Sequence, residues 1–273
     1  MEQPDMGQQE VVLLCEDSLE GIFSGVYEAY RRHFRPQSAH LRTEEIGNYS
    51  LFTEYIEIET EAAKAKKVMR TLRERFGMEA YMAVCQAAAS YQTGKADAVY
   101  HTIARGLHKK YPKQIMGDLT DDAVRKVFEL SRAVNNEVLH WRGFLRFEEL
   151  EGGILFARIG PKTDILTYLA PHFADRFPQE NFMIYDENRA QLVLHPAGGE
   201  WYKTQLTVND AESAMAKGEL PYSETEQEYQ ELFRYFCHKI AIKERENRDL
   251  QRGMCPLRFQ YYMPEFNKNV KIK

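Results

Sequence analysis

The sequence lacks the cysteine patterns that build metal clusters. Its four cysteines, Cys15, Cys85, Cys237 and Cys255, are widely separated and form no C-x-x-C pair. Protein sites for zinc or iron–sulfur clusters usually draw on closely spaced cysteines. We therefore predict no metal site and no cofactor in this chain, and we expect the cysteines to be reduced and buried.

Targeting signals, membrane spans and common catalytic motifs are also missing. The opening residues, MEQPDMGQQE, lack the basic start and apolar middle of a secretory signal, and the apolar runs are far too short to span a bilayer. We expect a cytoplasmic protein without membrane association. There is no G-x-S-x-G, Walker A, H-E-x-x-H or G-x-G-x-x-G motif, so the main hydrolase, nucleotide-binding and metalloprotease classes have no support.

Charge is distributed unevenly, although the net charge is only −5. Residues 200–233 carry eight acidic side chains and two lysines, whereas residues 234–273 carry ten Lys/Arg and four acids. Residues 61–110 also carry ten Lys/Arg and four acids. Such blocks predict basic surfaces that could meet a polyanion, or else solvated helix faces with counter-charges nearby.

The apolar pattern predicts an α+β protein, with residues 1–142 mostly helical after a β-α opening. Helical periods cover residues 19–32, 62–76, 79–91, 96–109 and 121–139, and strands are expected at 11–15 and 55–60. Thr120 is the expected N-cap of the last of these helices. We place the second region at residues 143–273, with one continuous domain as the alternative.

Residues 143–195 predict a β-β-α-β-β unit. The first hairpin turns at Glu151-Gly152-Gly153 and the second at residues 186–189, where Asn188 tolerates a left-handed backbone. Residues 225–249 are expected to form a helix that docks on the body through its apolar positions, followed by a tail whose aromatic residues are buried. The docking positions are Tyr229, Leu232, Phe233, Phe236 and Ile240, and the tail residues are Phe259, Tyr262 and Phe266.

The stretch 165–177, ILTYLAPHFADRF, places polar residues on an amphipathic helix. His172 and Arg176 lie one turn apart beside an apolar stripe, and Pro171 predicts a kink or a new helix start. Either His172 caps a helix piece while Arg176 pairs with Asp175 or Asp186, or His172 and Arg176 hold an anion between them. The stripe consists of Leu166, Leu169, Phe173 and Phe177.

The first hairpin raises a related question. A three-residue loop would put Arg146 opposite Arg158, and like charges facing each other across a ladder destabilise it. Carboxylates such as Glu148 or Asp164 would relieve the repulsion, and so would a bound phosphate. A two-residue Gly-Gly turn would remove the alignment.

Several segments carry a resemblance to a known family: RGFLRFEEL, ILFARIGPKTDILTYLAPHFADRF, FMIYDENR and IAIKERENRDLQRGMCPLRFQYYMPEF. With the opening EDSLEGIFSGVYEAY, they make the chain resemble an uncharacterised bacterial family described as probable DNA metabolism proteins, a domain of unknown function. The resemblance implies a partner, a radical S-adenosylmethionine protein of DNA modification or repair. The scattered cysteines agree with the partner holding any iron–sulfur cluster.

Our leading hypothesis is an accessory protein of DNA metabolism that contacts nucleic acid, the radical S-adenosylmethionine partner, or both. The expected nucleic-acid contacts are Arg146, Arg158, His172 and Arg176, with Arg258 as an outer residue. If the tail is buried, Arg258 is expected to form a local ion pair. If the tail is exposed, its aromatics could stack on bases.

Two other functions stay open. The first is an enzyme acting on a nucleobase or phosphodiester, with His172 as general acid or base oriented by Asp164 or Asp186. The simplest roles of these aspartates are a helix N-cap for Asp164 and a turn ion pair with Arg189 for Asp186. The second is a pure protein–protein adaptor.

Overall fold

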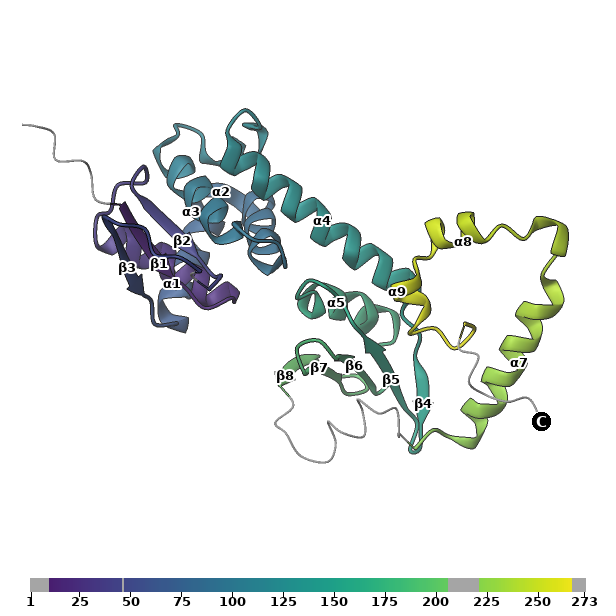
Figure 1. Ribbon diagram of the computed structural model, residues 1–273. Coiled ribbons are helices and arrows are strands. Elements are labelled where there is room, and N and C mark those ends of the chain that lie inside the picture. The colour runs from purple at the N-terminus through teal and green to yellow at the C-terminus, as the bar shows by residue number, and fades with distance from the viewer. Residues whose placement is uncertain (1–9, 46, 206–220, 267–273) are drawn as a thin grey trace, which may run out of the picture. The chain divides into compact units, whose positions relative to one another are not determined.

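A computed structural model describes residues 10–45, 47–205 and 221–266 (Figure 1). The chain forms two compact units, Met1–Asn135 and Asn136–Lys273, and the helix α4 (Asp122–Phe144) contributes to both. The fold is α+β with a helix-rich first half, as the sequence predicts. The predictions for the N-terminal leader, and for residues 206–220 of the acidic stretch, lie outside the described residues.

The first unit contains a small parallel sheet. Its strands are in the order β2-β1-β3: β1 (Glu10–Leu14), β2 (Ala39–Arg42) and β3 (Thr53–Glu57). The helix α1 (Leu19–Arg31) connects β1 to β2 and packs closely, because Gly25 lies where a Cβ atom would come 2.3 Å from Sγ of Cys15. This arrangement confirms the β-α opening.

Helices make up the rest of the first unit. They are α2 (Ala62–Ala89), α3 (Lys95–His108), the 3-10 helix η1 (Pro112–Gly117) and the first part of α4. A non-helical backbone at Gly77, with φ of 79°, divides α2 near the boundary between the two helices that the sequence predicts. The expected cap of α4 was wrong: Asp121, rather than Thr120, accepts the N–H groups of Ala123 and Val124, at 3.0 and 3.1 Å.

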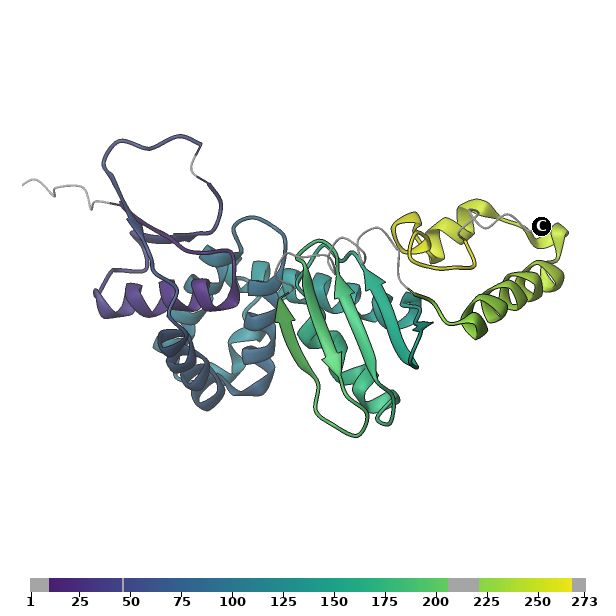
Figure 2. The same cartoon turned by 90° about the horizontal axis from the view of Figure 1, so that it is seen from below.

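The second unit is built on a five-stranded sheet, in the order β4-β5-β6-β7-β8 (Figure 2). Its elements are β4 (Glu148–Leu150), β5 (Ile154–Ile159), α5 (Leu166–Arg176), β6 (Phe182–Asp186), β7 (Gln191–His195) and β8 (Tyr202–Gln205). The first five confirm the β-β-α-β-β unit, with β5 and β6 parallel and joined through α5. The sequence missed β8 because all its residues are exposed, so apolar alternation is absent.

Turn geometry explains both hairpins. Leu150 pairs with Ile154, which gives the three-residue loop, and Gly152 and Gly153 have φ of 86° and 73°. In the second turn the left-handed residue is Ala190, with φ of 52°, and not Asn188 as expected.

The helix α5 runs through Pro171 without the new start that was one expectation. Its apolar stripe is confirmed, since Leu166, Leu169 and Phe173 are buried. The cap differs from the simplest expectation for Asp164, because the N-cap residue is Ile165 and no side chain caps the helix. The helix packs against β6 and β7.

The C-terminal segment is divided into short helices instead of one helix over 225–249. They are α7 (Glu224–Ile240), the 3-10 helix η2 (Lys243–Arg245), α8 (Arg248–Met254) and α9 (Leu257–Gln260). Asn247 starts α8, since its side chain accepts the N–H of Leu250 at 3.0 Å. In the tail, Phe259 is fully buried and Met263 is 4% exposed, whereas Tyr262 and Phe266 are half-buried.

Cysteine burial follows the expectation only for Cys15 and Cys85. Cys237 and Cys255 are half-buried, and all four thiols are free. None of the helices within the described ranges has the length and apolar character needed to cross a membrane.

Candidate functional site

Two arginines and a histidine gather where the end of α4 meets α5. Arg142 reaches the carbonyl of Tyr168, at 3.4 Å, and thus lies over α5. Arg176 lies one turn after His172 on α5, and burial together with the charges of Arg142 and Arg176 lowers the pKa of His172. In the part of the chain that the structure describes, neither arginine forms a salt bridge. Arg142, His172 and Arg176, hereafter the cationic cluster, therefore offer an anion a place to bind.

The sequence identified two members of this cluster. His172 and Arg176 were paired by their helical spacing, but Arg142 lies on another helix and only tertiary packing brings it close. The guanidinium of Arg176 lies over the ring of Phe177, 5.6 Å from its centroid, and the residue is exposed.

Arg146 and Arg158 contact the tail instead. The loop length places them in the expected register, but β4 begins at Glu148, so Arg146 precedes the ladder. Arg146 pairs with Glu265 at 2.9 Å. Arg158 lies 3.8 Å from Glu187, and its guanidinium is 5.4 Å from the centroid of the Tyr261 ring. Glu265 and Glu187, which were not the carboxylates expected from the sequence, thus supply the compensation, and both arginines have structural contacts.

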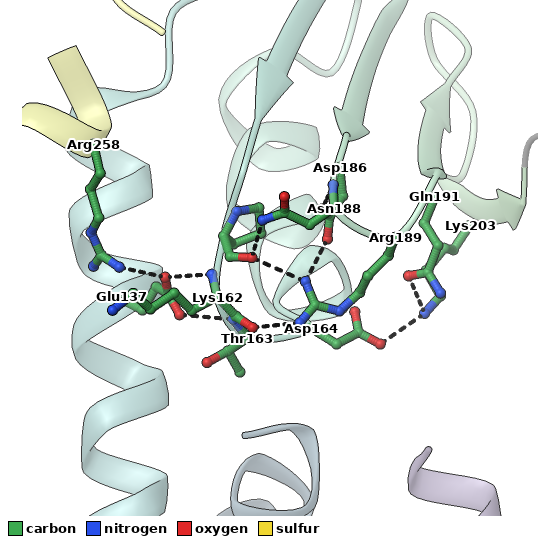
Figure 3. A network of polar contacts seen from close by, with 11 residues as sticks. Glu137, Lys162, Thr163, Asp164, Asp186, Asn188, Arg189, Gln191, Lys203 and Arg258 are labelled. Carbon is green, nitrogen blue, oxygen red and sulfur yellow. Dashed lines mark hydrogen bonds and ion pairs between the residues drawn. The ribbon is translucent and has the colours of Figure 1, made fainter. Parts of the chain in front are cut away.

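Arg258 is tied into a buried carboxylate site (Figure 3). Glu137 on α4, only 6% exposed, accepts the backbone N–H groups of Lys162 and Thr163 at 2.9 and 3.1 Å. The same carboxylate accepts a hydrogen bond from Nη1 of Arg258 at 3.2 Å. Arg258 therefore forms the local ion pair expected for a docked tail. Sequence reasoning missed Glu137 because its partners are distant in the chain.

Asp186 forms the turn ion pair that the sequence favoured. The side chain is fully buried. Its oxygens accept hydrogen bonds from Nη1 of Arg189 and from the backbone N–H of Asn188, at 3.1 and 3.0 Å. Arg189 also donates to the carbonyls of Pro161 and Lys162, so the turn is joined to the loop before α5 (Figure 3). Burial outweighs the attraction of Arg189 and raises the pKa of Asp186 to about 6.

Asp164 lies next to this turn. One carboxylate oxygen is 3.4 Å from Nζ of Lys203, which also lies 3.3 Å from Oε1 of Gln191 (Figure 3). The other oxygen is buried and has no hydrogen-bond partner among the described residues. The charge of Asp164 contributes to the raised pKa of Asp186, so the two carboxylates are neighbours.

His172 makes no described polar contact with either aspartate. Asp164 precedes the first residue of α5, whereas His172 lies in the second turn of that helix. The contacts found for His172 are the ring of Phe173 and the charges of the cationic cluster and Asp175. Within the described ranges, no hydrogen bond or salt bridge joins it to Asp164 or Asp186. The structure does not assemble these three residues into one acid–base group.

Among the described residues of the second unit, none covers the apolar face of the helix α7. Its first turns are held at β4, where Gln230 donates to Glu148 at 3.2 Å and Glu226 accepts the N–H of Glu149 at 3.1 Å. No described residue of α7 is buried, so the expected docking on the body was wrong. The uncovered residues are Tyr229, Leu232, Phe233, Phe236 and Ile240, which are between 43% and 63% exposed; we call them the α7 face.

A group of possible metal ligands lies in the first unit. It comprises His40 on β2 and Asp97 and His101 on α3. The cysteine pattern, on which the prediction of no metal site rested, gives no indication of this group. The spacing of Asp97 and His101, four residues apart in a helix, was the available signal, but the third member joins them only through folding.

The fold and these surfaces define a two-unit α+β protein with a cationic cluster and an uncovered helix face. The model of one family matches residues 93–265, which is more than half of the chain. The chain therefore belongs to the family described as a domain of unknown function, DUF4130. No curated protein matches the sequence.

Proposed function

We propose that this chain is an accessory protein of DNA metabolism that docks onto a radical S-adenosylmethionine protein through the α7 face and contacts nucleic acid through the cationic cluster. The observation that carries the proposal is the exposure of the α7 face. Its residues follow helical spacing, and an apolar stripe of this kind is normally buried against another element. Docking against another protein would bury it.

The choice of partner rests on the family resemblance. The uneven charge supports an additional contact with a polyanion, because residues 234–273 are basic although the whole chain is acidic. Arg142 and Arg176 are exposed and form no salt bridge with any described carboxylate, so a phosphate would not have to displace one. The cationic cluster is therefore the preferred nucleic-acid contact over Arg146, Arg158 and Arg258, which have carboxylate neighbours.

The enzyme hypothesis receives less support. A general acid or base needs an orienting partner and a position beside the reacting group. The charges of Arg142 and Arg176 lower the pKa of His172, and the acidic group that opposes them is Asp175. No specific observation favours the enzyme over the accessory role.

Fluorescence anisotropy tests the nucleic-acid part. Labelled single-stranded and double-stranded oligonucleotides are titrated with the full chain at low and moderate salt, with and without the partner. Replacing both Arg142→Gln and Arg176→Gln should weaken binding roughly tenfold or more at low salt, and should reduce the salt slope by about 0.9 per lost phosphate contact on duplex DNA.

The matched control is Arg132→Gln, an exposed arginine earlier on α4, which should bind like the wild type. Absence of binding at low salt, both alone and with the partner, would remove nucleic acid from the proposal. Equal binding by the double variant and the wild type would remove the cationic cluster from it.

A further inference from the structure

We propose that His40, Asp97 and His101 form a binding site for a divalent first-row transition-metal ion. Each residue offers one ligand atom, and these atoms all lie within 4.8 Å of one another. Oδ1 of Asp97 is 3.1 Å from Nδ1 of His40 and 3.3 Å from Nε2 of His101. Two imidazole nitrogens and one carboxylate oxygen therefore converge at the surface of the first unit.

The separations match those between ligands that share one ion. Zinc binds imidazole nitrogen and carboxylate oxygen at about 2.0–2.2 Å, so neighbouring ligands in a tetrahedral site are about 3.3 Å apart. Both nitrogen–oxygen separations agree with this value.

The ligand types favour a particular class of metal. Imidazole suits zinc, iron, nickel and copper, whereas calcium and magnesium prefer sites built only from oxygen. Two histidines and one carboxylate leave further coordination positions for water or another ligand. The side chains are 38%, 35% and 24% exposed for His40, Asp97 and His101, so solvent can reach those positions.

The surrounding structure holds the ligands in place. Asp97 and His101 lie one turn apart on α3, and α3 packs against β2, which carries His40. The backbone N–H of Leu41 donates to Oδ1 of Asp97 at 3.2 Å and so fixes the orientation of the carboxylate. Hydrogen bonds of this kind commonly orient metal-binding carboxylates. The ring of Tyr100 lies 5.1 Å from that of His101 and limits its movement.

Metal binding is tested on the full chain after treatment with a chelator. The protein is dialysed against micromolar Zn²⁺, and the bound metal is measured by atomic emission. We expect about one zinc per chain, a higher unfolding temperature that chelator reverses, and visible d–d absorption of tetrahedral type when Co²⁺ is used instead. His40→Gln and His101→Gln should each lower the affinity for Zn²⁺ roughly tenfold or more.

The matched control is His108→Gln on the same helix, which should retain wild-type affinity. In His101→Gln the new amide can still donate to Asp97, so we expect the variant to stay folded after the chelator has removed the metal. Circular dichroism of the metal-free variant checks this. The proposal is overturned if the wild type retains no zinc, or if His101→Gln and His108→Gln bind it equally. A plain His–Asp–His ion-pair cluster would give those results. The experiment does not measure binding of DNA or of the partner, so its result is independent of whether the proposed function is correct.

Discussion

Glu137 and Asp186 are buried carboxylates that hold the loop before α5 from two sides. Glu137 accepts two backbone N–H groups of residues 161–163, and Arg189, paired with Asp186, donates to two carbonyls of the same loop. The turn ion pair was predictable because its partners are three residues apart. The role of Glu137 was not, because its partner Arg258 is far along the chain and meets it only in the folded unit.

Asp186 predicts a particular dependence of stability on pH. Its pKa is raised from 3.8 to about 6, so the folded state holds a proton that the unfolded state releases. The contribution of Asp186 to the free energy of unfolding is therefore fully present below the pKa of the unfolded state. It is lost as pH rises from about 4, the pKa in the unfolded state, to about 6, the pKa in the folded state. Between these limits the wild type should lose about 3 kcal/mol of unfolding free energy more than Asp186→Asn does.

Urea unfolding at several pH values, followed by tryptophan fluorescence, measures this difference. Both tryptophans, Trp141 and Trp201, belong to the second unit and therefore report on it. The exposed Asp175→Asn variant serves as the control and should follow the wild-type pH profile. Parallel profiles for wild type and Asp186→Asn would show that the pKa of Asp186 is not raised.

Glu137→Gln should destabilise the second unit. The amide has only one acceptor oxygen, and its NH₂ group faces a backbone donor or Arg258, so a buried donor loses its partner. We expect a loss of about 2–3 kcal/mol in unfolding free energy, measured by the same fluorescence experiment. Glu129→Gln, an exposed residue of the same helix, should change it by less than about 0.5 kcal/mol. Equal stabilities of the two variants would show that the hydrogen bonds of Glu137 to the loop before α5 and to Arg258 do not stabilise the second unit.

At the scale of elements, α9 and α7 show what hydrophobic periodicity can and cannot predict. The sequence predicts an apolar face on α7 and buried aromatic residues in the tail. We expect the rest of the chain to cover both segments. Of the tail aromatics only Phe259 is fully buried: it packs on Trp141 and Phe144, with ring centroids 4.9 and 5.0 Å away, while Tyr262 and Phe266 are half-buried. Periodicity identifies a face that needs a partner, but it does not say whether that partner is in the same chain.

Alanine substitutions in α9 and α7 should differ in their effect on the free energy of unfolding. Phe259→Ala should cost about 3–5 kcal/mol, because it removes a fully buried ring from an aromatic cluster. Phe236→Ala should cost less than about 0.5 kcal/mol, because that ring is 54% exposed. Thermal and urea unfolding of the two variants provide the comparison. A similar loss in both would mean that α7 packs on the body in solution.

At the scale of the whole molecule, the two units carry different candidate chemistry. The first unit holds the His40–Asp97–His101 group, and the second holds the cationic cluster and the α7 face. The family match begins at residue 93, so it includes Asp97 and His101 but not His40. The fold class and the β-β-α-β-β unit followed from local patterns in the sequence. The composition of each site did not, because each combines residues from separate elements.

The most direct test of the proposed accessory role is the affinity of the full chain for the proposed radical S-adenosylmethionine partner, measured by calorimetry. Wild type should bind, and the double variant Leu232→Glu/Phe236→Glu should bind roughly 100-fold more weakly or worse, because charges would enter a buried contact. Leu51→Glu/Phe52→Glu alters an apolar pair of the first unit that is even more exposed, at 87% and 89%, and should retain wild-type affinity. No binding by the wild type, or equal binding by the wild type and the α7 variant, would contradict the account.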